Sequence, residues 1–285
     1  MIRTGIAILL VAAGLFGLRL LAWQLTRLTS RALERLTDAL DRTRHHHRVA
    51  GLGTALAQRF PRTARVIAAR TTRQQFTGLP LTLMTLAALY VLVLIGGLVE
   101  ELLEAEEMVR FDHWVNQGLS ALRSDNLLGV FSWLTGLGDS VTVVAVALAT
   151  TGLVWAYRHT HAIVPLWTVV IGSQITTYTS KYILARERPE AVTEIIAITP
   201  SFPSGHSTSA MAVYGFLVYL IARNLPAVRQ RFEVVFWSAT IIALIGFSRM
   251  ILGLHYASDV AAGFLIGVLW LLIGFALIEY RARSD

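Results

Sequence analysis

The chain has 285 residues, of which 55% are hydrophobic and 15% charged, and its mean hydropathy is +0.59. Soluble domains carry about 25% charged residues, so this composition argues against a soluble domain and favours a membrane protein. The net charge of +7 does not indicate a nucleic-acid groove, because the basic residues lie mostly between apolar stretches. The sequence has no cysteine, which excludes disulfides, thiolate metal sites and a cysteine nucleophile.

Seven apolar stretches are long enough, or nearly so, to cross the roughly 30 Å hydrocarbon layer as helices. They cover residues 5–24, 78–99, 137–157, 162–180, 206–222, 234–251 and 256–279. Arg19 interrupts the first stretch, which could also be a signal peptide. No clear cleavage pattern follows it, so we expect an uncleaved anchor. The sequence therefore predicts an all-α integral membrane protein with an extra N-terminal transmembrane helix.

The segment 25–77 is rich in arginine. Its leucines recur at helical spacing between residues 25 and 40, which is typical of an amphipathic helix on an anionic membrane surface. A solvated linker explains the segment equally well. Three consecutive histidines, His45 to His47, could bind a metal, but a solvated basic stretch accounts for them more simply.

The charges of the loops alternate in sign, as membrane topology requires. The basic segment 25–77, the connection 158–161, the turn 223–231 and the C-terminal tail are predicted to be cytoplasmic. The acidic loop 100–125 is then external, and so are the loop 181–205 and the turn 249–255. Glu100, Glu104 and Glu107 would share a helical face and could hold a divalent ion, although a solvated surface is the simpler explanation.

The first polar segment, Lys181 to Pro189, follows the fourth predicted span and contains the only lysine of the chain. If the helix continues, Lys181 and Arg188 lie on one face, and Pro189 ends the helix. Two such cations can clamp an anion. Snorkelling of the cations to the membrane surface is the structural alternative.

The second polar segment, Ser201 to Ser207, precedes the fifth predicted span. Ser204 and Gly205 stand where a helix should begin, and the free backbone N–H groups of a helix start can bind phosphate. Gly205 also lets a ligand approach the backbone closely. His206 projects from the first turn. The alternative is an N-cap serine beside an incidental histidine.

The third polar segment runs from Ser248 to Asp259. His255 and Asp259 are four residues apart at the start of the seventh predicted span, so their side chains should meet. A carboxylate on one ring nitrogen leaves the other free as a nucleophile. Gly253 is predicted to break the helix, so that Arg249 and His255 face one site. A pair that only stabilises the helix is the alternative.

Together the segments read Lys-x6-Arg-Pro, Pro-Ser-Gly-His and Ser-Arg-x5-His-x3-Asp. This pattern resembles the three-part signature of the type 2 phosphatidic acid phosphatase family. The matching positions are Lys181, Arg188, Pro189, Pro203, Ser204, Gly205, His206, Ser248, Arg249, His255 and Asp259. The resemblance covers roughly residues 78–280 and implies the six-helix transmembrane core of that family. We therefore expect a phosphatase domain at 78–285, preceded by a membrane anchor and a basic cytoplasmic segment at 1–77.

The resemblance implies a metal-independent enzyme, without a cofactor, that acts on a lipid phosphate in a bacterial inner membrane. The charges of the loops predict that its site lies on the external face. His255 would be the nucleophile, Asp259 would hold its ring, and His206 would be the general acid and base. The groups implied to bind the phosphoryl oxygens are Lys181, Arg188, Ser204, Gly205 and Arg249.

The expected substrates are undecaprenyl diphosphate, phosphatidylglycerol phosphate and phosphatidic acid, with a slight preference for the diphosphate. The sequence indicates no nucleic-acid partner and no particular oligomeric state. Two alternatives stay open at this point: a lipid phosphotransferase that uses the same phosphohistidine, and a lipid-phosphate binder without catalysis.

Overall fold

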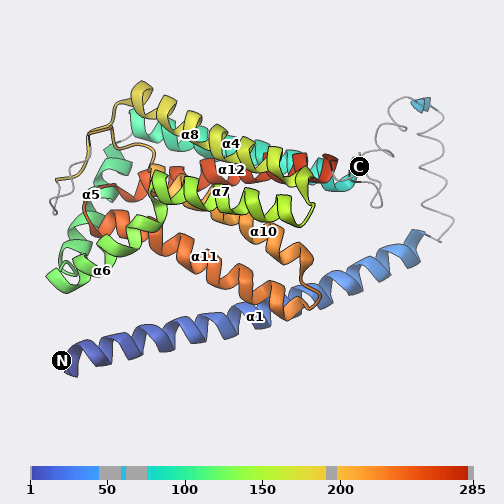
Figure 1. Ribbon diagram of the computed structural model, residues 1–285, viewed down its shortest axis with the longest axis horizontal. Helices are drawn as coiled ribbons and strands as arrows, with labels where there is room; N and C mark the ends of the chain where they lie inside the picture. The colour runs from blue at the N-terminus through green and yellow to red at the C-terminus, as the bar shows by residue number, and fades with distance from the viewer. Residues whose placement is uncertain are drawn as a thin grey trace. The chain divides into compact units, whose positions relative to one another are not determined.

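The computed structural model describes residues 2–44, 59–61, 76, 78–104, 106–190 and 198–281 (Figure 1). The chain divides into two compact units, Met1–Thr72 and Arg73–Asp285. The described residues form helices and connecting segments without a β-strand. His45 to His47, for which a metal site was considered, lie outside the described residues.

The first unit contains α1 (Ile2–Arg44), a single helix of 43 residues. It joins the predicted first span to the leucine-bearing part of the basic segment without a break. Leu25, Leu28, Leu33 and Leu36 are all exposed on it. The helical spacing of these leucines is therefore confirmed, and the predicted contact with a leaflet stays a prediction.

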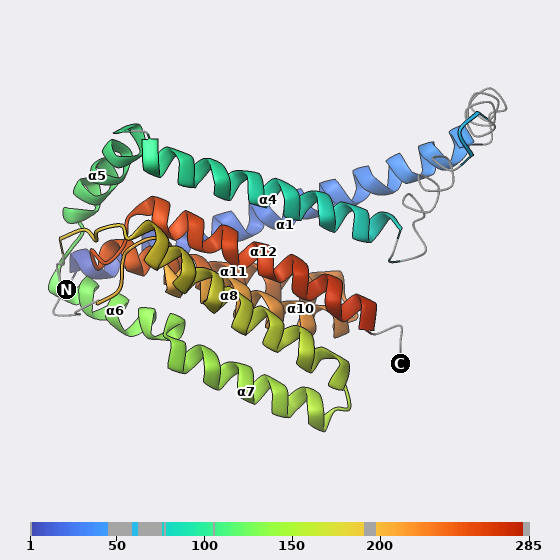
Figure 2. The ribbon, with the colours of Figure 1, turned by 90° about the horizontal axis from the view of Figure 1, so that it is seen from above.

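The second unit is a helical bundle. Its elements are α4 (Leu79–Glu104), α5 (Glu106–Ser120), α6 (Asp125–Thr135), η1 (Gly136–Gly138), α7 (Ser140–Ala156), η2 (Thr160–Ala162), α8 (Ile163–Leu184), α9 (Gly205–Ser209), η3 (Ala210–Tyr214), α10 (Gly215–Asn224), α11 (Val228–Ile251) and α12 (Ala257–Arg281). Figure 2 shows α12 between α4 and α8, and α12 makes its most extensive helix contacts with these two.

Four described stretches are long and apolar enough to cross a membrane: α4, the run from α9 to α10, α11 and α12. The pair formed by α6 with η1 and by α7, bent by 47°, could be a fifth. The predicted spans in α1 and α8 are not among them. The second half of α8 carries serine, threonine, glutamine and lysine, which lower its hydropathy. Its first half nevertheless lies in the core.

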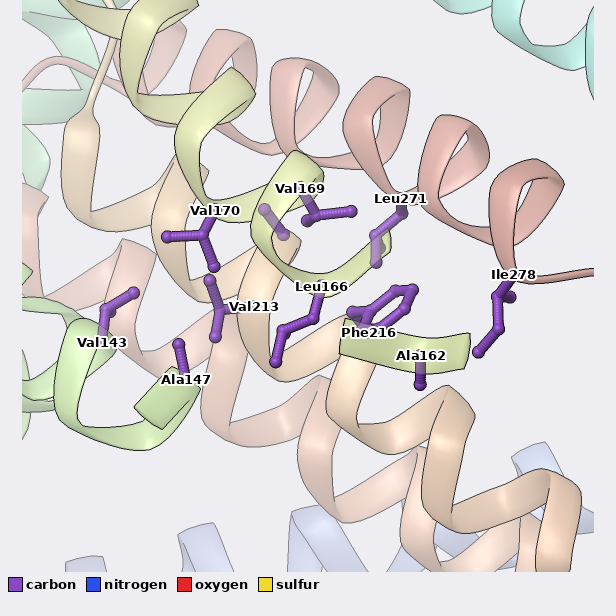
Figure 3. Close-up of a cluster of buried hydrophobic side chains, with 11 residues drawn as sticks. Val143, Ala147, Ala162, Leu166, Val169, Val170, Val213, Phe216, Leu271 and Ile278 are labelled. Atoms are coloured by element: carbon purple, nitrogen blue, oxygen red, sulfur yellow. The ribbon is translucent and has the colours of Figure 1, made fainter. Parts of the chain in front are cut away.

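The core of the bundle is an apolar cluster contributed by α7, α8, η3, α10 and α12 (Figure 3). Val143, Leu166, Val169, Val213 and Phe216 are each at most 1% exposed. In lipid, close packing rather than escape from water holds such side chains together. The cluster therefore fixes the positions of the helices that carry the polar segments.

Two glycines of α12 allow the start of the fifth span to pack closely against it. A Cβ atom on Gly263 would lie 2.6 Å from the carbonyl oxygen of Ser204, and one on Gly267 would lie 2.5 Å from Cβ of Met211. Small residues four apart are the usual device for close approach of membrane helices. They hold the run from α9 through η3 against α12.

The element η3 is a π-helix between α9 and α10. A π-turn contains one residue more than an α-turn and commonly appears near functional sites. The residues ahead of it in α9, including His206, therefore have a different rotational setting from α10.

The acidic loop 100–125 contains two helices that the sequence did not predict, α5 and the start of α6. Figures 1 and 2 both show these helices at the end of the bundle where the chain leaves α8. Arg123 donates to the carbonyl oxygens of Ile251 (2.8 Å) and Met250 (3.1 Å). The loop and the turn after α11 therefore share one end, as the alternation of charge predicted.

Two of the acidic residues of this loop pair with an arginine on the same helix. Glu106 and Glu107 both lie within 4 Å of Arg110, at 3.2 Å and 3.8 Å. Over the described ranges, which omit residue 105, no three histidine or carboxylate side chains gather as metal ligands would.

Candidate active site

The three polar segments meet around one cavity of about 500 Å³ at the end of the bundle that carries α5 and α6. Six predicted site residues line it: Lys181, Arg188, Gly205, His206, Arg249 and His255. The two histidines therefore face the same space, although they are far apart in the sequence. Ser204 and Asp259 lie behind the wall and are fully buried.

Lys181 reaches the cavity from the last turn of α8. The helix ends at Leu184, and Ala185 adopts a left-handed conformation with φ 45°. The prediction of one continuous helical face from Lys181 to Arg188 is therefore wrong. Arg188 comes from the following loop, and the two cations meet because both donate to the carbonyl oxygen of Pro200.

Arg188 is held by backbone acceptors and points one amino group at the predicted nucleophile. Its Nε donates to the carbonyl oxygen of Thr199 (2.8 Å), and Nη1 donates to that of Leu254 (2.6 Å). Nη1 also lies 3.2 Å from Nε2 of His255. A guanidinium only donates, so Nε2 of His255 is the unprotonated ring nitrogen.

The other ring nitrogen of His255 faces Asp259. Nδ1 lies 3.3 Å from Oδ2 of Asp259, and the same oxygen accepts from the backbone N–H of Tyr256 (2.9 Å). The carboxylate thus closes the first turn of α12 as an acidic residue of a capping box does. Burial lowers the pKa of His255 from its ordinary value of 6.5 to about 3, against the opposing effect of Asp259. The imidazole is therefore neutral at physiological pH.

Gly253 breaks α11 as predicted and turns the chain toward the cavity. Its φ is 67°. The N–H of Leu254 donates to the carbonyl of Arg249 (3.0 Å), and that of Gly253 donates to Met250 (3.1 Å). This pair of bonds is a Schellman motif, which requires a left-handed residue after the helix. It allows Arg249 and His255 to line one cavity.

A buried chain of charges lies behind Asp259, and the sequence did not reveal it. Nη1 of Arg186 donates to Oδ1 of Asp259 (2.6 Å), and Nη2 donates to Oδ2 of Asp112 on α5 (2.7 Å). Ser201 also donates to Asp259. Burial alone would lower the pKa of Arg186, but Asp259 and Asp112 outweigh it and raise that pKa. The guanidinium is a permanent bridge between the two carboxylates.

Arg249 enters the cavity from the end of α11 and is 5% exposed. Its Nη1 donates to Oγ1 of Thr135 (2.9 Å), which is on α6. Its Nε–H has no hydrogen-bond partner in the described structure. Since buried donors are nearly always paired, this atom is available to a bound acceptor.

His206 has a carboxylate partner that the sequence analysis missed. Its Nε2 lies 2.6 Å from Oδ1 of Asp139, the residue that precedes α7. Asp139 also lines the cavity. The only hint in the sequence was that Asp139 stands at the start of the predicted span 137–157. An acidic residue at a helix start is ordinarily explained by capping.

Ser204 is the N-cap of α9, which is the structural alternative to phosphate binding. Its Oγ accepts from the N–H of Ser207 (3.4 Å) as the N-cap of α9, and also from the Ser207 hydroxyl (3.0 Å). Its side chain does not line the cavity, whereas the next residue, Gly205, does. Phosphate binding by Ser204 stays a prediction.

Comparison with known proteins finds similar sequences. The family model described as the PAP2 superfamily matches residues 162–283. Phosphatidylglycerophosphatase B of Bacillus subtilis (strain 168) is 29% identical over 159 residues, which are 55% of this chain and 78% of that protein. Lipid A 1-phosphatase of Rhizobium etli is 31% identical over 112 residues, which are 36% of this chain and 44% of that protein.

A solved structure has a similar fold. It is a transmembrane PAP2-type phosphatidylglycerolphosphate phosphatase from Bacillus subtilis, with a TM-score of 0.63 and 23% identity over 70% of this chain and 97% of that one. The matched range 162–283 contains all three polar segments, from Lys181 to Asp259. The chain is thus a multi-pass membrane protein whose residues 162–283 match the PAP2 superfamily.

Proposed function

We propose that the protein hydrolyses a lipid phosphate through a phosphohistidine on His255. The observation that carries this proposal is the setting of the His255 ring. Nε2 faces the cavity beside Arg188, and Nδ1 faces the buried carboxylate of Asp259. A neutral imidazole oriented in this way is a nucleophile aimed at a site for an anion.

In the first step the lone pair of His255 Nε2 attacks phosphorus, and the bond from phosphorus to the lipid oxygen breaks. His206 gives a proton to that leaving oxygen. In the second step His206 takes a proton from water, whose oxygen attacks phosphorus and breaks the P–N bond. The products are the dephosphorylated lipid, inorganic phosphate and the free histidine, and His206 returns to its first protonation state.

Three cations line the cavity and would neutralise the phosphoryl oxygens in both steps: Lys181, Arg188 and Arg249. Phosphoryl transfer depends mainly on positioning and electrostatic stabilisation. We therefore propose that these side chains, with the backbone N–H of Gly205, supply the charge that a metal ion supplies in other phosphatases. On this basis activity should persist in EDTA.

The substrate class follows from the setting of the cavity and from the relatives. The cavity opens at the end of a transmembrane bundle, where a lipid headgroup would lie. The relatives are named as phosphatases of phosphatidylglycerophosphate and of lipid A. We propose a lipid phosphate as substrate, with the site on the external face of the bacterial inner membrane because the loop 100–125 at that end is acidic.

The proposal is tested with the full chain purified in detergent. Phosphate release is measured from phosphatidylglycerol phosphate, phosphatidic acid and undecaprenyl diphosphate, with and without EDTA. We expect release from at least one of them, and His255→Ala should abolish it because the substitution removes the proposed nucleophile. His159→Ala is the matched control, since His159 lies at the other end of α7.

Native-like turnover by the His255→Ala protein would contradict the nucleophile. Counting free phosphate against dephosphorylated lipid separates hydrolysis from transfer to a second lipid. One phosphate released for each lipid supports hydrolysis, and a phosphorylated acceptor lipid would contradict it.

A further inference from the structure

Thr177 has a buried hydroxyl without a hydrogen-bond partner inside the site cavity. It lies on α8, one turn before Lys181, and is 1% exposed. Its Oγ1 is one of two buried side-chain polar atoms in the described residues that make no hydrogen bond. The three polar segments of the signature do not include Thr177, and the mechanism above does not use it.

Other threonines in the helices of this chain satisfy their hydroxyls locally. Thr150 donates to the carbonyl of Val146 (2.7 Å), Thr168 to that of Val164 (2.9 Å) and Thr240 to that of Phe236 (2.9 Å). Donation to the carbonyl four residues back is the ordinary choice for a helical threonine. Thr177 does not make this bond to Ser173, although it occupies a regular stretch of α8.

The second unpartnered atom lies in the wall of the same cavity. It is Nε of Arg249, which is a donor only. Its missing partner must therefore be an acceptor. Thr177 also stands beside Gly205, since a Cβ atom built on that glycine would lie 3.7 Å from Cγ2 of Thr177. The unpaired hydroxyl of Thr177 and the unpaired Nε–H of Arg249 thus border the space that the proposed phosphoryl group would occupy.

We infer that Thr177 is a further substrate-binding residue whose hydroxyl donates a hydrogen bond to a phosphoryl oxygen. The inference rests on the proposed function, because it takes the phosphoryl group to be the occupant of the cavity. Its ligand is a tetrahedral oxyanion, and inorganic vanadate has this shape and charge without the lipid. The lipid alcohol is the other source of an oxygen that Thr177 could reach, and vanadate binding distinguishes the two.

The test compares orthovanadate binding by the full chain and its variants in detergent, followed by tryptophan fluorescence or by the shift in thermal unfolding midpoint. Thr177→Val removes the hydroxyl and keeps the shape of the side chain. We expect its affinity for vanadate to fall about tenfold or more, as for loss of a hydrogen bond to a charged group. Thr177→Ser should bind as the unaltered chain does.

Thr168→Val is the matched control. It removes a hydroxyl from the same helix, but that hydroxyl is bonded to its own backbone, so vanadate affinity should not change. If the valine variant fails to fold, Thr177→Ala and Thr177→Ser provide the same comparison with and without a hydroxyl. Equal vanadate affinity for both members of either pair overturns the inference.

A Thr177→Val protein that binds vanadate normally but shows a raised KM for lipid also overturns it, because the hydroxyl then serves the alcohol. Vanadate binding is measured without turnover, so failure of the proposed function can be distinguished from failure of the role proposed for Thr177. A chain that releases no phosphate from lipids contradicts the proposed function. The vanadate comparison between valine and serine at position 177 still decides for or against Thr177.

Discussion

At the scale of single residues, the chemistry depends on what stands behind each histidine. Asp259 accepts from four donors, which are His255, Tyr256, Ser201 and Arg186. This arrangement fixes the carboxylate and, through it, the ring of His255. His206 has the single carboxylate of Asp139, which is half-exposed at the rim of the cavity. The proposed nucleophile, His255, is therefore rigidly held and buried, whereas the proposed proton donor, His206, lies where solvent can reach it.

The buried neutral state of His255 predicts a pH dependence of stability. Its pKa is lowered to about 3 in the folded chain, whereas the ordinary value is 6.5. Between these values the unfolded chain binds a proton that the folded chain does not, so the free energy of unfolding falls as pH falls from 6.5 toward 3. This one proton contributes up to about 1.4 kcal/mol per pH unit.

The measurement is the thermal unfolding midpoint in detergent between pH 7 and pH 4, for the unaltered chain and for His255→Gln. Glutamine does not titrate in this range. The midpoint of the His255→Gln protein should therefore fall less steeply on acidification. Parallel curves for the two proteins would show that His255 is not buried in its neutral form.

The sequence predicted the residues that line the cavity more successfully than the acidic residues that hydrogen-bond to the polar segments. Hydropathy and spacing pointed to His206, His255 and Asp259, since each stands beside an apolar span. Asp112 and Asp139 were missed because each is an isolated acid, and their partners are 146 and 67 residues away. These pairs form only when the tertiary structure brings distant segments together. No local pattern in a single sequence therefore reveals them.

At the scale of elements, α5 is tied to the site by its buried acid rather than by an apolar face. Asp112 is 1% exposed, whereas Phe111 and Trp114 on the same helix are 53% and 71% exposed. The acid accepts from the backbone N–H of Ser258 (3.0 Å) and from Arg186 (2.7 Å). Exposed aromatic side chains are enriched at membrane interfaces, so α5 joins the membrane surface to the start of α12.

Loss of Arg186 should therefore destabilise the fold and reduce activity. Arg186→Gln leaves two buried carboxylates without their cation, which typically costs about 3–5 kcal/mol. Arg110→Gln is the matched control on α5, because Arg110 pairs with Glu106 at the surface and exposed pairs contribute less than about 1 kcal/mol.

Chemical denaturation and phosphate release check both effects. If the two substitutions lower stability equally, the bridge between Asp112 and Asp259 does not hold the site. Partial recovery of activity in Arg186→Lys would support positioning by charge.

The close approach of α12 and α9 predicts opposite effects for two glycine substitutions. In Gly263→Ala the new methyl group meets the backbone of Ser204 at 2.6 Å. The start of α9 must then move, at a cost of about 1–3 kcal/mol, and kcat should fall because His206 moves with it. Gly152→Ala on α7 has no atom within 4 Å of the new methyl group, so it should stabilise the helix by about 0.5–1 kcal/mol.

Thermal unfolding and kcat measured for both variants check this prediction. Normal kcat in the Gly263→Ala protein would mean that the packing of α9 against α12 does not set the position of His206.

The sequence predicted the long apolar helices better than the short amphipathic ones. The span expected at 234–251 lies inside α11, and those expected at 78–99 and 256–279 lie inside α4 and α12 except for their first residue. Helix α5 falls within the predicted loop 100–125, because it buries a carboxylate and exposes its aromatic residues. The expected helix from Lys181 to Arg188 failed because Ala185, a good helix former, takes a left-handed conformation there. Tertiary contacts of the 199–201 loop override local preference at that position.

At the scale of the whole molecule, the bundle separates its charges between two ends. The cavity, α5 and α6 share one end, and the basic connections after α7 and α10 share the other. From the positive-inside trend we propose that the cavity lies outside the cytoplasm. The division of the first 77 residues into an anchor and a basic cytoplasmic segment stays a prediction.

The absence of native cysteine allows a direct test of this orientation. Glu106→Cys on α5 and Arg229→Cys at the start of α11 each give a single exposed thiol. In intact spheroplasts a membrane-impermeant maleimide should label the first and not the second. Both should react after permeabilisation. The reverse pattern would place the cavity in the cytoplasm.

The π-turn at 210–214 makes the length of this stretch as important as its residue types. If one residue were deleted there, the run could close as regular α-helix, and everything ahead of it would rotate by about 100° around the axis. His206 would then leave the cavity even though every letter of the signature is intact. A homologue with a one-residue gap between Gly205 and Gly215 could therefore look like an enzyme in an alignment and still be inert, so counting positions there would help to recognise pseudoenzymes.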